Sequence, residues 1–497
     1  MNRYLRALLP LLLSSGTAHA TLDCDWDAVN SLLPPNVSLS FVTAMPEDGT
    51  FTVPRGDTGW PTDPIDLPNL CAIGATVLGD TANAGFGLGL FLPSQWNGRT
   101  LNIGNGGLAG GVNWVDMVRK SPSTESQPGT GVNWGWRALH ETVIYGKQIT
   151  KAFYGTRPST GGRQGFKEAE AFPRDFDGII AGAPAWWTQI WQFWVGYVNY
   201  ISNITMIPTS KFDVIGREVL RQCDGQDGLV DTIISDPLGC NFNPETLLCS
   251  SAVTDPTDAE CLTAAQLQTF DTLSRDFRAT NSTLVFPAWL RGSEHFWTLN
   301  IDGGGAEHHR TRIHPIHAGD VIQLSERLDP GQADAAAYNL SAFSHGGGKL
   351  LHYHGMSDGG IATGASYYLY EQIDRTPTPQ GVHVDNFYRF FPIPGMGSAA
   401  DYVNAPYYIT GISMTTNGKY SVPNFHDAKH DVLLALMEWV ENGTALDAVI
   451  GTAYANFTTM DAITRQRPIC AHPKLAQYQG RGDPDRPENW RCQALGS

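Results

Sequence analysis

The stretch AFYGTRPSTGGRQGFKEAEAFPRDFDGIIAGAPA, residues 152–185, decides the fold. In it, Ser159 stands directly before Thr160-Gly161-Gly162 and a segment that is predicted to be helical. A serine at a sharp turn into a helix is the arrangement of a nucleophile elbow. Two residues earlier, however, Arg157 stands where that motif has glycine, and Pro158 precedes the serine. The stretch therefore predicts a nucleophile at Ser159 with an unusual approach to it.

The N-terminus predicts export from the cell. Arg3 and Arg6 precede the short apolar run ALLPLLLSS, and Ala18-His19-Ala20 has the small residues of a cleavage site. These are the parts of a secretory signal peptide, which we expect to span residues 1–20. No later apolar run is long enough to cross a bilayer. We expect a secreted protein that has no membrane partner.

Composition agrees with this compartment and excludes some partners. The eight cysteines form an even set, as expected for disulfide pairs outside the cell. Six N-x-S/T sequons predict a glycoprotein: Asn36, Asn203, Asn281, Asn339, Asn442 and Asn456. The formal net charge of -16 argues against nucleic acid or an anionic membrane as a partner. The oligomeric state stays open.

The pattern of strands and helices predicts an α/β fold with a mostly parallel sheet. Three apolar strands each run into a glycine-rich loop, in residues 99–113, 348–361 and 386–397. Helical periodicity is present in residues 136–153 and again in 430–443, where Asn442-Gly443 predicts a C-cap. Loops at the carboxyl ends of parallel strands are where active sites are built.

The middle of the chain, residues 186–344, differs from the rest in composition. It holds four of the eight cysteines, many Asp, Asn and Pro turns, and the aromatic run WWTQIWQFWVGYVNY. We interpret it as an inserted lid domain. Its aromatic side chains are suited to stacking on a phenolic ring, although such residues more often form a core.

A short loop inside this segment, residues 223–240 and called the carboxylate loop below, is a candidate metal site. It contains Asp224, Asp227 and Asp231, with Leu229 and Ile233 between and after them. Ca²⁺ prefers six to eight oxygen ligands, and three carboxylates plus two backbone carbonyls supply most of them. The alternative is a solvated acidic turn closed by a Cys223–Cys240 disulfide.

Six motifs together resemble the tannase/feruloyl esterase family, whose members are secreted α/β-hydrolases with a calcium-binding lid domain. The family's nucleophile region is resembled by STGGRQGFKEAEAFPRDFDGIIAGAPA, its oxyanion loop by GNGGLAGGVN, and its calcium loop by CDGQDGLVDTIISDP. YHGMSDGGI resembles the loop of the catalytic acid, KHDVLLALMEWVENGTALDAVIGTAY the closing helix, and RPICAHPKLAQYQGRGD the C-terminal disulfide loop. The resemblance covers essentially the whole mature chain.

The resemblance implies a Ser–Asp–His triad with Ser159 as nucleophile and Asp358 as acid, in the order usual for α/β-hydrolases. The oxyanion would be bound by the backbone N–H of Thr160 and by one N–H of the turn that contains Gly107. The hydrolase domain would comprise residues 21–185 and 345–497, and the lid residues 186–344.

The resemblance also implies a structural metal and four disulfides. Ca²⁺ would bind Asp224, Asp227, Leu229, Asp231 and Ile233 and brace the lid rather than take part in chemistry. The implied disulfides are Cys24–Cys71, Cys223–Cys240, Cys249–Cys261 and Cys470–Cys492.

The chain departs from the family pattern around the catalytic machinery. Family members have Gly-Cys-Ser after a short strand, whereas here four residues, 155–158, connect the preceding helix to Ser159. Ser398 and Ala399 occupy the positions of the family's His-Cys, which supplies the base and a disulfide partner of the nucleophile region. A further strand is missing after Met117. Both a degenerate or repurposed gene and wrongly trimmed exons explain these gaps.

Other histidines are weaker candidates for the base. His430 matches the family's helix-start histidine, which predicts a capping or packing role. His426 lies in the adjacent loop, and His383 precedes a strand. His352 and His354 flank the acid and are predicted to be structural.

The implied activity is hydrolysis of aromatic-acid esters, feruloyl or galloyl groups on plant polysaccharides or polyphenols, by a serine carboxylic ester hydrolase. The alternative is a family member that is catalytically impaired or repurposed, either as a binder or as a tailoring enzyme of specialised metabolism, because the triad histidine and the strand before Ser159 are missing.

Overall fold

The structure is a computed structural model. It describes residues 18–19, 23–54, 63–79, 85–96, 99–103, 112, 114, 133–153, 158–159, 162–205, 207–251, 260–301, 331–376, 381–397, 405–410, 422–456 and 459–494. The chain divides into two compact units. Unit 1 comprises Met1–Leu101, Gly110–Ser123 and Glu141–Pro158, and unit 2 comprises Asn102–Ala109, Thr124–His140 and Ser159–Ser497.

Unit 1 is built on an antiparallel sheet of three strands in the order β2-β3-β4. These are β2 (Val37–Met45), β3 (Leu70–Val77) and β4 (Phe86–Pro93), and helix α1 (Trp26–Asn30) precedes them. Short strands β1 (Ala18–His19) and β5 (Gln95–Trp96) pair with each other, as do β6 (Thr100–Leu101) and β7 (Pro158–Ser159). Helix α4 (Ala138–Phe153) enters unit 1 at Glu141; its first residues and the preceding π-helical turn η1 (Asn133–Arg137) belong to unit 2.

Aromatic packing explains one glycine of this sheet. The rings of Phe41, Phe51 and Phe91 surround Trp114, with centroid distances to Trp114 of 5.6, 4.8 and 5.4 Å. A Cβ atom on Gly89 of β4 would lie 2.7 Å from the Trp114 ring. Glycine is therefore required there because the indole lies directly against the strand.

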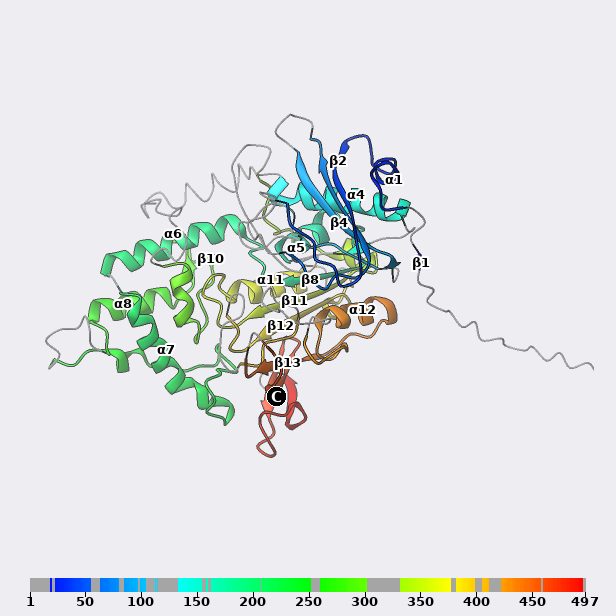
Figure 1. Ribbon diagram of the computed structural model, residues 1–497. Coiled ribbons are helices and arrows are strands. Elements are labelled where there is room, and N and C mark those ends of the chain that lie inside the picture. The colour runs from blue at the N-terminus through cyan, green and yellow to red at the C-terminus, as the bar shows by residue number, and fades with distance from the viewer. Residues whose placement is uncertain are drawn as a thin grey trace, which may run out of the picture. The chain divides into compact units, whose positions relative to one another are not determined.

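Unit 2 contains a parallel sheet in the order β12-β11-β8 (Figure 1). Its strands are β8 (Gly178–Gly182), β11 (Lys349–Gly355) and β12 (Tyr388–Ile393). In the centre of the sheet, Leu351 pairs with Ile180 on one side and with Arg389 on the other. All three strands are largely buried, as expected for a parallel sheet that is covered on both faces.

Helices cover both faces of this sheet. Helix α12 (Val432–Asn442) packs on the face of Leu351, and it begins at the cap Asp431 and ends at Gly443, whose φ is 73°. Helices α5 (Gly162–Ala171) and α11 (Gly364–Arg375) lie on the face of His352 and contact it through the Phe166 ring and the Ser366 hydroxyl. The C-cap predicted at Asn442-Gly443 is confirmed.

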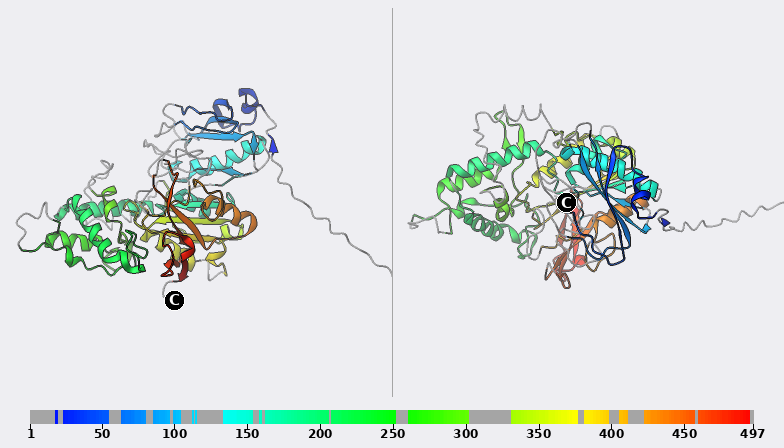
Figure 2. Two further views of the ribbon diagram at one scale, coloured as in Figure 1. Left: turned by 60° about the horizontal axis from the view of Figure 1, so that its bottom comes forward. Right: turned by 45° about the horizontal axis from the view of Figure 1, so that its top comes forward.

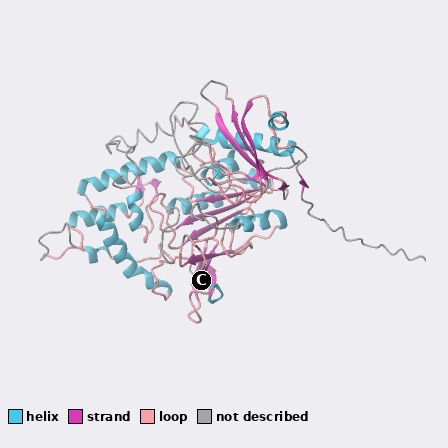
Figure 3. Ribbon diagram, in the orientation of Figure 1, coloured by secondary structure: helices cyan, strands magenta, loops and turns pink. Residues whose placement is uncertain are grey.

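The segment from 186 to 301 gathers helices with a hydrophobic core of their own (Figure 3). Its elements are α6 (Thr188–Thr205), α7 (Ser210–Cys223), η2 (Asp224–Asp227), η3 (Pro244–Leu247), α8 (Ala264–Leu273), β9 (Phe277–Arg278), β10 (Leu284–Phe286) and η4 (Glu294–Leu299). Trp186 and Trp194 of the aromatic run are 1% and 2% exposed. Much of the aromatic run therefore serves as core, the role that the sequence analysis ranked first.

The C-terminal part of unit 2 consists of two antiparallel hairpins (Figure 2). Strand β13 (Ala448–Tyr454) pairs with β14 (Ile463–Cys470), and β15 (Lys474–Tyr478) pairs with β16 (Trp490–Ala494). The remaining short helices are α10 (Ser341–His345), η8 (Val384–Asn386) and η9 (Pro487–Asn489).

One expectation needs adjustment. The sheet of unit 2 is parallel, but the sheet of unit 1 is antiparallel, which its short glycine-punctuated apolar strands did not reveal. The predicted lid, residues 186–344, lies within unit 2, and its division from the hydrolase domain stays a prediction. Among the described residues, no helix combines the length and apolar character needed to cross a membrane.

Candidate active site

Asp358 lies in the loop that follows the central strand β11 (residues 356–361, the Asp358 loop) and is 1% exposed. Its Oδ1 atom accepts hydrogen bonds from the backbone N–H groups of Gly360 (2.7 Å) and Ile361 (2.9 Å). Its Oδ2 atom lies 3.1 Å from Nε2 of His354. Two backbone N–H groups and the His354 ring thus hold the carboxylate at the carboxyl end of the sheet, where ligand sites of parallel sheets occur.

The loops after β11 and β12 lie against each other. The N–H of Ser357 donates to the carbonyl oxygen of Met396 at 2.9 Å. A Cβ atom on Gly355 would lie 2.3 Å from that same carbonyl oxygen and 2.6 Å from the carbonyl oxygen of Gly397. The contact therefore requires glycine at 355, since any side chain would separate the two loops.

Residues of the predicted lid also contact the Asp358 loop. The indole N–H groups of Trp191 and Trp289 donate to the carbonyl oxygens of Gly360 (2.9 Å) and Gly359 (3.0 Å). The side-chain amide of Asn300 contacts both carbonyl oxygens, at 2.9 and 2.7 Å. The sequence analysis missed these three residues because nothing in their spacing relates them to Asp358.

His354 is a second contact that the sequence did not reveal. His352 and His354 were predicted to be structural, and both are 0% exposed. The signal lay in the strand alternation, because side chains two residues apart share a face and that face leads into the Asp358 loop. His354 is not free to act as the base: its Nδ1 atom bonds Ser366 Oγ at 2.7 Å and its Nε2 atom already faces Asp358.

Ser159 ends the two-residue strand β7, and α5 begins three residues later at Gly162. The oxyanion candidates Thr160 and Gly107 lie outside the described residues, as do Ser398 and Ala399 at the position of the family's base. His430 bonds Asp427 at 2.8 Å through Nδ1 and stacks on Phe425, which confirms its predicted structural role.

The carboxylate loop folds around Asp224, which is 6% exposed. One carboxylate oxygen accepts the N–H groups of Asp231 (3.1 Å) and Ile233 (3.3 Å), and the other accepts the N–H of Thr232 (2.9 Å). Asp227 accepts the N–H of Leu229 at 3.0 Å. These bonds bring the five predicted metal-ligating residues into one compact turn.

Charge is concentrated in this loop. Burial, together with the nearby Asp231, raises the pKa of Asp227. Asp231 forms a salt bridge with Arg467 of β14, whose guanidinium stacks over Trp490 at 4.4 Å. Ile233 is 2% exposed, and no donor among the described residues reaches its carbonyl oxygen or that of Leu229.

The donor set therefore fits a hard cation such as Ca²⁺. In the structure, the carboxylates of Asp224, Asp227 and Asp231 do not bring one oxygen each within 4.8 Å of the other two. An ion would require these side chains to turn toward one another.

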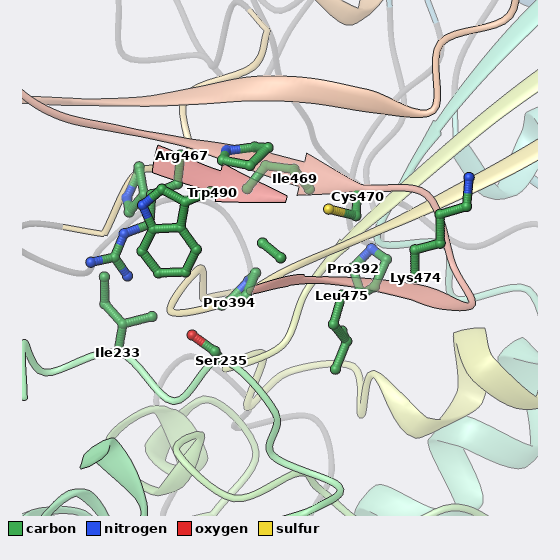
Figure 4. A pocket seen from close by; sticks show the side chains of 13 residues that line it. Ile233, Ser235, Pro392, Pro394, Arg467, Ile469, Cys470, Lys474, Leu475 and Trp490 are labelled. Atoms are coloured by element: carbon green, nitrogen blue, oxygen red, sulfur yellow. The ribbon is translucent and has the colours of Figure 1, made fainter. Parts of the chain in front are cut away.

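A small cavity adjoins this loop and is lined by Ile233, Ser235, Arg467, Trp490 and several prolines (Figure 4). Its volume of about 20 Å³ accommodates about one water molecule. The cavity is therefore too small to be the site of an aromatic ester.

All four implied disulfides are present. They are Cys24–Cys71, Cys223–Cys240, Cys249–Cys261 and Cys470–Cys492, and no described cysteine is free. Cys223–Cys240 closes the carboxylate loop, as both interpretations of that loop required.

Among the described residues, one group has the composition of a metal site: His140, Glu168 and Asp175, whose ligand atoms lie within 4.8 Å of one another. Nδ1 of His140 lies 2.8 Å from Asp175 Oδ2 and 3.8 Å from Glu168 Oε2. Burial lowers the pKa of His140, but the hydrogen bond to Asp175 and the nearby carboxylate of Glu168 outweigh it and raise the pKa to about 9. The group is thus an ion-pair cluster around a protonated imidazole.

Comparison with known proteins agrees with the geometry. The family model of tannase and feruloyl esterase matches residues 116–289 and 318–493, more than half of the chain. A probable feruloyl esterase B-2 of Aspergillus oryzae is 30% identical over 543 residues, which cover 98% of this chain and 99% of that protein.

Solved structures extend the likeness to the fold. The crystal structure of feruloyl esterase B from Aspergillus oryzae superposes with a TM-score of 0.81 at 27% identity and covers 93% of this chain and 98% of that one. Tannin acyl hydrolase from Aspergillus niger has a TM-score of 0.69 at 18% identity, with 96% of each chain covered, and supports the fold alone. The chain belongs to the tannase and feruloyl esterase family of carboxylic ester hydrolases.

Proposed function

We propose that this protein is a secreted α/β-hydrolase that cleaves feruloyl or galloyl esters of plant polysaccharides or polyphenols. The observation that carries the proposal is Asp358, which is buried at the carboxyl end of β11 and held by two backbone N–H groups and the His354 ring, at the position of the family's catalytic acid. The feruloyl assignment draws on the named relatives.

In this proposal Ser159 attacks the ester carbonyl, and the backbone N–H groups of Thr160 and Gly107 bind the oxyanion. The alcohol leaves with the proton from Ser159, and water then releases the aromatic acid from the acyl-enzyme. The base that transfers these protons stands at position 398 in the family, where this chain has Ser398.

The lid and the metal complete the proposal. Residues 186–344 form the lid, whose own hydrophobic core and bonds to Gly359 and Gly360 support this role. Ca²⁺ bound by Asp224, Asp227, Leu229, Asp231 and Ile233 would supply charge neutralisation in the carboxylate loop. Export through a signal peptide at residues 1–20 agrees with the disulfides.

Expression of the full chain and assays with methyl ferulate and methyl gallate test the proposal. We expect turnover that Ser159→Ala lowers by at least about a thousandfold. Turnover that survives Ser159→Ala would contradict the assignment of the nucleophile.

The impaired or repurposed alternative rests on one observation. The only described histidine that is hydrogen-bonded to Asp358 is His354, which is buried and whose two ring nitrogens both have hydrogen-bond partners. Binding of methyl ferulate without hydrolysis favours this alternative. A gain of turnover in Ser398→His would identify the missing base, and additional codons in the transcript around positions 115–135, 154–160 and 395–400 would show trimmed exons instead.

A further inference from the structure

A continuous line of buried polar side chains runs from Tyr388 to Asp358. Tyr388 OH lies 2.7 Å from His352 Nδ1, and His352 Nε2 lies 3.0 Å from Ser366 Oγ. Ser366 Oγ lies 2.7 Å from His354 Nδ1, and His354 Nε2 lies 3.1 Å from Asp358 Oδ2. None of the five residues is more than 1% exposed. We call this set the Tyr388–Asp358 network.

The end at Asp358 determines where the first proton lies. His354 Nε2 faces the carboxylate of Asp358 and, also at 3.1 Å, the carbonyl oxygen of Ile361. An ionised carboxylate and a carbonyl only accept hydrogen bonds, so Nε2 must carry a proton. In a neutral imidazole the other nitrogen is then an acceptor, and Nδ1 of His354 must receive the hydroxyl proton of Ser366.

The same reasoning passes along the line. Because the Ser366 hydroxyl donates to His354, it must accept from His352, and Nε2 of His352 carries a proton. Nδ1 of His352 then accepts from the hydroxyl of Tyr388. Burial lowers the pKa of His352 well below its usual value, which agrees with a neutral ring.

The reversed order leaves a polar group without a partner. If His352 donated from Nδ1, the hydroxyl proton of Tyr388 would have no acceptor among the described residues, in a side chain that is 0% exposed. Leaving a buried donor unpaired costs about 1–3 kcal/mol. Both ends of the line therefore favour the same direction.

We propose that the Tyr388–Asp358 network positions the catalytic acid and that all its hydrogen bonds run in one direction. In this arrangement both histidines are neutral and protonated on Nε2. Every donor points toward Asp358, and the last one holds Oδ2. His354 and Ser366 are positioning residues, since they act through Asp358 and do not contact substrate. The functional part of this inference rests on the role of Asp358 in the proposed function.

NMR of the full chain labelled with ¹⁵N-histidine reads the tautomers directly. We expect both rings in the neutral Nε2–H form at pH 7, with signals assigned by their loss in His352→Asn and His354→Asn. An imidazolium form or an Nδ1–H tautomer at either ring would overturn the proposal. This readout needs no turnover, so it decides the proton order even if the chain proves not to be an esterase.

Two variants that each lose one hydroxyl separate the ends of the network. In Tyr388→Phe, His354 should keep its Nε2–H form, because Asp358 and Ile361 set it; a change of its tautomer would contradict the assigned direction. In Ser366→Ala, the His354 ring loses its Nδ1 anchor, and we expect kcat to fall about tenfold with KM unchanged.

The control for Ser366→Ala is Ser293→Ala in the lid segment, which removes a hydroxyl that is also 0% exposed and bonds the carbonyl oxygen of Leu290 and the Trp297 indole. It should lower stability by a similar amount and leave kcat unchanged. Equal kcat in Ser366→Ala and the unmodified protein would refute the positioning role.

Discussion

Nδ2 of Asn300 lies 2.7 Å from the carbonyl oxygen of Gly360, two residues beyond Asp358. Asn300 is 7% exposed and belongs to the lid segment, far from Asp358 in sequence. Because a second carbonyl oxygen, that of Gly359, accepts from the same amide at 2.9 Å, one side chain satisfies two loop groups. This segment thereby helps to define the position of Asp358.

Replacing Asn300 by leucine tests this relationship. Leucine has a similar size but no donor, so two carbonyl oxygens lose a partner and the unfolding free energy should fall by about 1–3 kcal/mol. We expect kcat toward methyl ferulate to fall as well, since the Asp358 loop is released. The control is Asn489→Leu, which removes one bond to the carbonyl oxygen of Asp483 in the C-terminal hairpin and should leave kcat unchanged. Equal effects of the two variants on kcat would contradict the link between Asn300 and the position of Asp358.

Gly355→Ala should separate the loops after β11 and β12. The added Cβ atom would lie 2.3 and 2.6 Å from two backbone carbonyl oxygens, and such overpacking costs about 1–3 kcal/mol. Urea denaturation measures this loss. Gly346→Ala is the control, because its Cβ atom would have no contact closer than 3.3 Å. If both variants unfold at the same urea concentration, the loop contact does not constrain position 355.

His140 should make stability depend on pH on the alkaline side. The pKa of His140 is raised to about 9 in the folded protein, above the usual value of about 6.5 for an unfolded chain. Its contribution is therefore fully present below pH 6.5 and is lost as the pH rises through 9. We expect about 1–2 kcal/mol, a value reduced for solvent screening of the partly exposed ring.

Thermal unfolding of His140→Asn between pH 6 and 9.5 provides the measurement. The variant should be less stable than the unmodified protein at pH 6 and should approach it near pH 9.5. His383→Asn, at an exposed histidine, should follow the unmodified protein throughout. A constant difference between His140→Asn and the unmodified protein across this range would contradict the raised pKa.

Calcium should stabilise the folded protein. After removal of metals with EDTA, added Ca²⁺ at a hundred times its dissociation constant should increase the unfolding free energy by about 2.7 kcal/mol, because only the folded loop assembles the ligands. Asp224→Asn should abolish the rise in Tm. Asp236→Asn, which lies in the same loop but outside the ligand set, should retain it. If added Ca²⁺ does not change the Tm of the unmodified protein, the metal site is contradicted and the loop is a solvated acidic turn.

The sequence alone predicted the features that depend on local pattern or on contiguous motifs. Helix α12 and its Gly443 cap follow from periodicity and from the left-handed conformation that glycine adopts at low cost. Asp358 was predicted to follow a strand, because the apolar run before it ends in a glycine-rich loop. The family resemblance also gave the four disulfide pairings, which elimination among eight cysteines would not have specified.

Only the tertiary structure decided what surrounds Asp358. His354 is four residues away, but its role depends on Ser366 and on the neighbouring strand that carries Tyr388, and Asn300 comes from another segment altogether. A sequence pattern records which face of a strand or helix a residue occupies and does not record which partner that face meets. Hydrogen bonds act over about 3 Å, so the contacts behind Asp358 become defined only when the chain has folded.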